Sequence, residues 1–168
     1  MPQNAGSATN PASRVIPPAP LACELRLLHS FGRTNAEAVN GWGVVTLASD
    51  GFLYGCATKT GPGGAGSIYR VRTNGTDYAV LRAFDWTKDG GEPTGGVIEG
   101  QDGAIYGTTF RGGSSDAGTI FRVAKDGTDF RVLRHFGAPG DCRYPQSDLL
   151  QASDGRIYGT ATGGGGHG

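Results

Sequence analysis

Short runs of β-branched and aromatic residues alternate with glycine-rich turns along most of the chain. In the best-preserved unit these runs are residues 96–100, 104–109, 118–124 and 129–136. Within the last run, apolar Phe130 and Val132 flank polar Arg131, which is the period of two expected for a half-buried strand. No stretch shows the apolar spacing and capping residues of an amphipathic helix. The pattern therefore predicts an all-β fold of short antiparallel strands.

This strand pattern repeats along the sequence. Asp-Gly pairs lie 52 residues apart at Asp50, Asp102 and Asp154, and Tyr-Gly pairs keep the same spacing at Tyr54, Tyr106 and Tyr158. Asp-Gly is a hairpin signal because glycine readily adopts the positive φ that such turns require. A period near 50 with four strands per unit is typical of a propeller blade rather than a helical solenoid. The sequence predicts tandem four-stranded antiparallel sheets of a partial β-propeller, with about two and a half blades.

The organisation outside the central unit is predicted from the same pattern. Residues 1–24 hold five of the nine prolines among Ala, Ser and Asn, which predicts a disordered lead-in. The repeats are expected at about 26–84, 85–136 and 137–168, the last with two strands. Propellers close with roughly four to eight blades, so we expect a fragment of a longer protein. The alternative is a short chain that closes by oligomerising. The edge of strand 156–161 is expected to stay unpaired and to promote self-association.

Composition and charge exclude several classes of protein. Glycine contributes 31 of 168 residues, and each would cost a helix about 1 kcal/mol relative to alanine. Fifteen basic and fifteen acidic residues give a net charge of zero, so nucleic-acid binding is not expected. The sequence contains no run of 18 apolar residues, so no transmembrane segment is predicted. The first basic residue is Arg14, and prolines at 17, 18 and 20 interrupt the residues after it, so no signal peptide is visible.

The residues of catalytic and metal chemistry form no recognised motif. The three histidines are isolated, and there is no HExxH, GxSxG or phosphate-loop sequence, which predicts no catalytic residues, no metal and no cofactor. Cys23, Cys56 and Cys142 are widely spaced without a CxxC pair. Three separate thiols are favoured, while a Cys23–Cys142 or Cys56–Cys142 disulfide stays open as an alternative.

Residues that recur in every repeat are interpreted as scaffold. The recurring tyrosines are expected to pack between neighbouring sheets, and Gly55, Gly107 and Gly159 to let backbones approach closely. Function is expected where the repeats differ, in the long connections that share one face of the array. We predict a ligand-binding site there. Its candidate residues are Trp42, Trp86, Asp89, Glu92, Arg111, Asp116 and Tyr144. Aromatic rings beside carboxylates suit a carbohydrate-like ligand, although ordinary solvated loop residues are the alternative.

Three segments carry a family resemblance. They read SDGFLYGCATKTGPGGAGSIYRVRTNGTDYAVLRAF, QDGAIYGTTFRGGSSDAGTIFRVAKDGTDFRVLRHF and SDGRIYGTATGGGGHG. This pattern resembles the GloVer tandem repeat of bacterial proteins with variable surface anchors, and it covers about residues 25–168. The resemblance implies export and surface display, and it implies no catalytic residues. The sequence shows neither the signal nor the anchor of that family.

These observations lead to two functional hypotheses. The first is a non-catalytic extracellular or cell-surface β-repeat module for binding or display, with carbohydrate or a surface protein as its partner. The second is part of a propeller hydrolase or lyase that acts on polysaccharide, with paired carboxylates drawn from the loop face.

Overall fold

The computed structural model of the chain describes residues 25–31, 39–60 and 63–166. All regular structure in these ranges is β-strand, and the strands form antiparallel sheets, two of them four-stranded, which confirms the all-β prediction. No helix in the described part of the chain is long and apolar enough to cross a membrane. The lead-in predicted at 1–24 lies outside the described residues.

The first sheet is a four-stranded meander. Its strands follow the chain in the order β1 (Val39–Leu47), β2 (Phe52–Lys59), β3 (Ser67–Arg72) and β4 (Ala79–Ala83). The turn between β1 and β2 is closed by Gly51, whose N–H donates to the carbonyl of Ala48 at 3.0 Å. Gly51 has a φ of 80°, as the Asp-Gly turn signal predicts.

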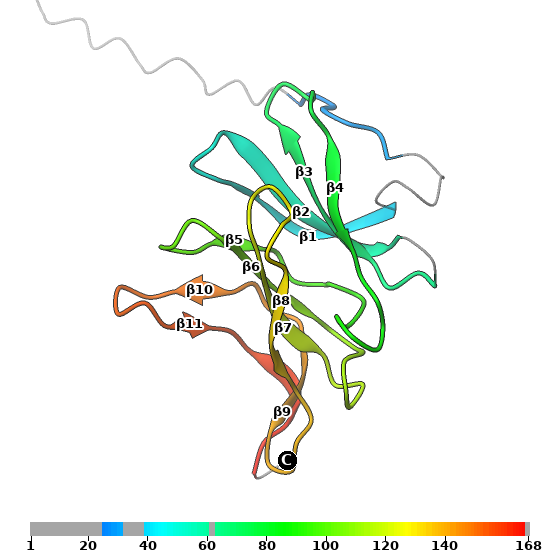
Figure 1. The fold of residues 1–168 in the computed structure, drawn as a ribbon, viewed down its shortest axis with the longest axis vertical. Coiled ribbons are helices and arrows are strands. Elements are labelled where there is room, and N and C mark those ends of the chain that lie inside the picture. Colours follow the sequence, from blue (N-terminus) through cyan, green and yellow to red (C-terminus); the bar gives the residue numbers. More distant parts are fainter. Residues whose placement is uncertain (1–24, 32–38, 61–62, 167–168) are drawn as a thin grey trace, which may run out of the picture.

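The second sheet repeats this arrangement. It contains β5 (Ile98–Glu99), β6 (Ile105–Thr109), β7 (Thr119–Val123) and β8 (Arg131–His135) in the same order. Ile98 lies opposite Tyr106, so the predicted strands 96–100 and 104–109 are paired with each other. Both sheets even shift register at the same point, after Ile68 in the first and after Ile120 in the second. Figure 1 shows the two sheets side by side.

A third unit follows with two paired segments. These are β9 (Cys142–Pro145) with β12 (Ala161–Gly164), and β10 (Leu150–Gln151) with β11 (Ile157–Tyr158). The pair Arg143–Gly163 matches the bridge Gly91–Arg111, so this unit corresponds to the first and second strands of the preceding repeat. Among the described residues β11 pairs only with β10 and β12 only with β9, so strand 156–161 has the open edge that the repeat pattern predicts.

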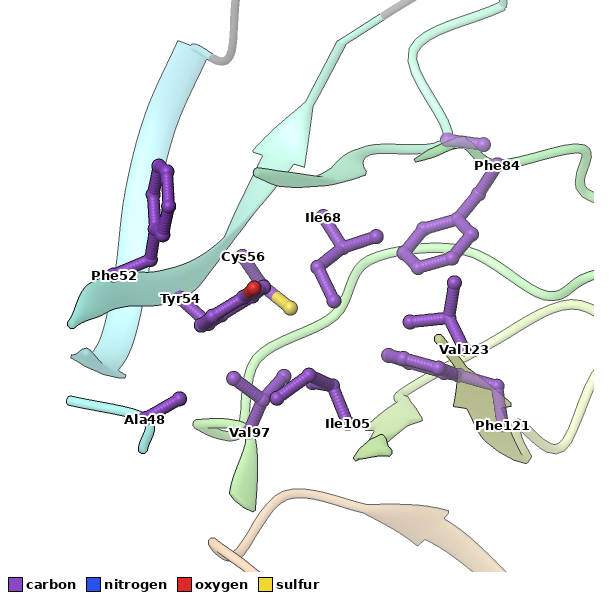
Figure 2. Close-up of a cluster of buried hydrophobic side chains, with 11 residues drawn as sticks. Ala48, Phe52, Tyr54, Cys56, Ile68, Phe84, Val97, Ile105, Phe121 and Val123 are labelled. Carbon is purple, nitrogen blue, oxygen red and sulfur yellow. The ribbon is translucent and has the colours of Figure 1, made fainter. Parts of the chain in front are cut away.

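The main hydrophobic core lies between the two four-stranded sheets. Tyr54, Cys56 and Ile68 point from the first sheet toward the second (Figure 2). They meet residues of the second sheet that are almost fully inaccessible to solvent. These are Val97, Ile105, Phe121 and Val123. Each repeat therefore buries its apolar side chains against the next one, as stacked repeats do.

Residues 25–31 pack against the first sheet. Their contact resembles the one that the residue after β4, Phe84, makes with the second sheet. The Phe31 ring lies 5.1 Å from Tyr69 and 5.9 Å from Tyr78, measured between centroids. At the next repeat, Phe84 lies 5.1 Å from Phe121 and 6.0 Å from Phe130. A phenylalanine that follows a fourth-strand position thus caps the aromatic residues of the following sheet.

Candidate ligand-binding face

The long connections of successive repeats meet at one end of the sheets. The indole Nε1 of Trp86 donates to the carbonyl of Gly63 at 2.9 Å. The N–H of Glu92 donates to the carbonyl of Ala65 at 2.8 Å, and the N–H of Tyr144 donates to that of Ala117 at 2.9 Å. These bonds join the loop between the second and third strands of one repeat to the segment that leads into the first strand of the next repeat. The variable loops therefore share one face.

Four side chains form a cluster on this face, of which Arg111 is exposed and the other three are half-buried. The Arg111 guanidinium lies 3.9 Å from the Glu92 carboxylate, and their side chains are 53% and 37% exposed. The same guanidinium lies 5.6 Å from the centre of the Phe110 ring. That ring is 5.3 Å from the ring of Tyr144. We refer to Glu92, Phe110, Arg111 and Tyr144 as the Arg111 cluster. It offers five guanidinium donors, a carboxylate acceptor and two aromatic rings at the surface.

Two residues of the cluster stand on a strained backbone position that recurs in the repeats. Asn40, Glu92 and Tyr144 have φ values of 57°, 52° and 60°. A non-glycine residue pays about 1 kcal/mol or more for this left-handed conformation. The three positions have the same backbone shape but present an amide, a carboxylate and a phenol. A constant geometry with a variable side chain is the arrangement expected of a recognition position.

The repeat pattern and its geometry agree with a comparison to known families. The model of the Gloeobacter/Verrucomicrobia repeat matches residues 17–168. The chain belongs to this repeat family. The match spans both four-stranded sheets and the third unit. No curated protein matches the chain.

The structure places Asp89 within the scaffold of the repeat. Its side chain is 5% exposed and accepts bonds from Arg82 at 2.7 to 3.0 Å. Arg134 and Asp141 make the same contact one repeat later, at 2.8 Å. Bonding to Arg134 holds the pKa of Asp141 below its usual value. The recurrence marks this ion pair as a structural element of the repeat.

The other predicted site residues lie at different places. The half-buried ring of Trp86 covers Gly91, where an added Cβ would lie 2.4 Å from a ring carbon. Asp116 is exposed and accepts a hydrogen bond from the N–H of Gly112 at 2.9 Å. Trp42 lies in β1 opposite Cys56 and is 63% exposed. Trp86 therefore borders the Arg111 cluster through the Gly91–Arg111 bridge, and Asp116 lies in the connection that begins at Arg111, whereas Trp42 lies in the first sheet.

Phe110 is the member of the cluster that the sequence pattern did not predict. The other two repeats carry Thr58 and Thr162 at this position, and their hydroxyls donate to the carbonyls of Asn40 and Tyr144. Phe110 replaces that small polar side chain with a ring. The signal was available, because a residue that differs between repeats is a candidate for function.

The thiols of the described residues are free. Cys56 and Cys142 form no disulfide, which excludes the Cys56–Cys142 alternative, and Cys23 lies outside the described part of the chain. Burial raises the pKa of the Cys56 thiol to about 12, so it stays protonated and unreactive at neutral pH. The described residues contain no group of three or more His, Cys, Asp or Glu side chains arranged to hold a metal ion.

Proposed function

We propose that this chain is a non-catalytic, extracellular or cell-surface module that binds carbohydrate through the Arg111 cluster. In this proposal the sheets are blades of a propeller-like array, which holds the loops on one face. The observation that carries the proposal is the exposed Arg111 guanidinium, flanked by an aromatic ring and by the Glu92 carboxylate. The resemblance to exported bacterial repeat proteins supports the location.

The chemistry of the cluster suits a sugar. A pyranose ring has apolar C–H faces that stack on aromatic rings, here those of Phe110 and Tyr144. Its hydroxyls both donate and accept, so they can bond with the Arg111 guanidinium and the Glu92 carboxylate at once. A rigid strand end beneath each residue lowers the entropy lost on binding.

The carboxylates of this face support binding rather than hydrolysis. A glycoside hydrolase needs two carboxyl groups about the scissile bond, and its acid has a raised pKa. Here Asp89 and Asp141 are held by arginines. The pKa of Asp85 is lowered by hydrogen bonds from Thr87, and that of Asp141 is lowered as well. These carboxylates stabilise loops in their ionised form.

The test measures binding of the full chain to polygalacturonate and to xylan by isothermal titration calorimetry. We expect saturable binding to at least one polymer, weakened tenfold or more by Arg111→Ala and by Phe110→Ala. Arg131→Ala is the matched control, because Arg131 is also an exposed strand arginine, with a side chain 67% accessible. The absence of binding, or equal weakening by the control, contradicts the proposal. Release of reducing ends that is lost in Glu92→Gln would instead establish the hydrolase or lyase.

A further inference from the structure

A glycine in the second strand of each sheet provides the seat for an aromatic ring from the third strand. Gly55 pairs directly with Tyr69, and Gly107 pairs directly with Phe121. A Cβ added at Gly55 would lie 2.6 Å from the Tyr69 hydroxyl oxygen, and one at Gly107 would lie 2.5 Å from Phe121 Cζ. The ring covers the glycine in both sheets because no side chain stands there.

The corresponding seat in the third unit is open. Gly159 occupies this position and is exposed, whereas Gly55 and Gly107 are buried. It lines an open cavity of about 340 Å³ together with apolar side chains of both neighbouring units. These include Ile120, Phe136, Leu149 and Ile157. Phe136 belongs to the series of Phe31 and Phe84, which touch the seated rings of the first and second sheets.

We propose that this cavity and the adjoining edge of β11 and β12 form a docking site for an extended strand of the same repeat chemistry. The strand places an aromatic residue opposite Gly159 and a valine opposite Ile157. This register follows from the two closed sheets, where the residues two positions after the seated rings pair with Leu53 and Ile105. Unpaired backbone groups of the edge supply the ladder of hydrogen bonds, as in other strand-addition complexes.

The occupant is a third-strand segment of the type Ile-(Tyr or Phe)-Arg-Val that is not yet part of a sheet. The matching strands of a second folded copy cannot serve, because Tyr69 and Phe121 are only 5% and 0% exposed within their own sheets. The cavity is also continuous with an established interface, since it repeats the contact between the first and second sheets one unit further on. The site uses none of the residues of the Arg111 cluster.

The experiment titrates the full chain into a fluorescently labelled peptide with the sequence of residues 117–136, the third and fourth strands of the second repeat. Fluorescence anisotropy reports binding. We expect saturable binding that falls tenfold or more when the peptide carries Phe121→Ala. We expect the same loss when the chain carries Gly159→Ala, because the added methyl group occupies the seat.

Gly166→Ala is the matched chain control, since a Cβ at Gly166 meets no atom within 4 Å. Circular dichroism and thermal melting verify that both glycine variants are folded. The proposal is overturned if the peptide does not bind, or if Phe121→Ala or Gly159→Ala leaves its affinity unchanged. Sedimentation velocity of the chain alone provides a further test. Self-association that Gly159→Ala abolishes, and that prevents the peptide from binding, would assign the edge to a second copy and overturn the proposal as well.

Discussion

The interface between the two four-stranded sheets differs from the one between the second sheet and the third unit. Ile105 is fully buried at the first interface, whereas its counterpart Ile157 is only half-buried at the second. First-strand residues differ less, since Val97 is 2% and Leu149 is 7% exposed. The preceding sheet is therefore enough to bury the first strand of a repeat. The second strand of that repeat becomes fully buried only where the third strand of the same repeat is also present. A repeat of this chain shares its core between its neighbour and its own third strand.

The largest effect is expected at the ring that closes the first interface. Phe121→Ala removes a fully buried side chain that packs against Phe84 and Phe130. We expect the free energy of unfolding to fall by about 3–5 kcal/mol, through lost transfer energy and the cavity left behind. Urea denaturation followed by circular dichroism measures the change.

Leu133→Ala is the control for this substitution, because Leu133 is 51% exposed in β8. An exposed apolar side chain contributes little, so we expect a change within about 0.5 kcal/mol. Equal losses for the two variants would show that the ring at position 121 is not the closing element of the interface.

The two glycine seats provide a second comparison. Alanine at Gly107 forces its Cβ against Phe121, and we expect a destabilisation of about 1–3 kcal/mol from overpacking. Alanine at Gly159 places its Cβ 2.8 Å from Leu149 Cδ2, the far end of a flexible side chain beside an open cavity, and 3.5 Å from the Ser147 hydroxyl oxygen, an ordinary contact. We expect that change to stay below about 0.5 kcal/mol. Thermal and urea unfolding of both variants test the difference, and equal effects would mean that the third-unit seat is already filled.

The strands and turns of the fold could be predicted because the signals for them are local. Asp102-Gly103 specifies a tight turn by its own backbone preference, and Gly103 indeed has a φ of 76°. The role of Gly107 could not be read in the same way. The sequence suggested close backbone approach, but the structure places an aromatic ring over the glycine, because the contact depends on the register between β6 and β7.

The candidate site shows a similar division. Arg111, Glu92 and Tyr144 were predicted as candidates because they lie in variable connections, whereas Phe110 was not a candidate because it follows directly on a strand that is otherwise regular. Asp89 was counted among the candidate site residues although an aspartate recurs at the equivalent position of the next repeat, Asp141, 52 residues later. Its ion pair with an arginine of the preceding strand is a tertiary contact that composition and turn signals do not reveal.

Alkaline pH is expected to separate the two interfaces through their tyrosines. Burial, followed by the Asp50 carboxylate, raises the pKa of Tyr54 to about 12 from 10.0. A raised pKa in the folded state stabilises the fold fully below pH 10, and this stability is lost as the pH rises toward and through 12. We expect the free energy of unfolding to fall by about 1 kcal/mol between pH 9 and 11 on account of this group.

Tyr54→Phe should remove this part of the alkaline loss. Tyr106, the equivalent residue facing the third unit, has a pKa that partial burial also raises, and it donates to Asp102 at 3.0 Å. Because Tyr106 is only half-buried, Tyr106→Phe should change the pH dependence less than Tyr54→Phe does. Urea unfolding at pH 7, 9 and 11 measures the three proteins. A steeper alkaline loss in Tyr54→Phe than in the unaltered chain would reverse the assigned sign.

The smallest expected effect comes from deleting one methyl group on each side of the comparison. Ile105→Val removes a methyl group from a fully buried position, where the loss is about 0.5–1.5 kcal/mol. Ile157→Val removes the same group beside the open cavity, where solvent already reaches the side chain, and we expect less than about 0.5 kcal/mol. Both substitutions keep a β-branched side chain, so strand propensity is constant and only burial differs.

If the third-strand peptide docks as proposed, a saturating amount of it should enlarge the loss of stability caused by Ile157→Val and leave that caused by Ile105→Val unchanged. Equal costs without the peptide would mean that Ile157 is as well packed as Ile105, and the difference between the two interfaces would then lie in the first strands alone.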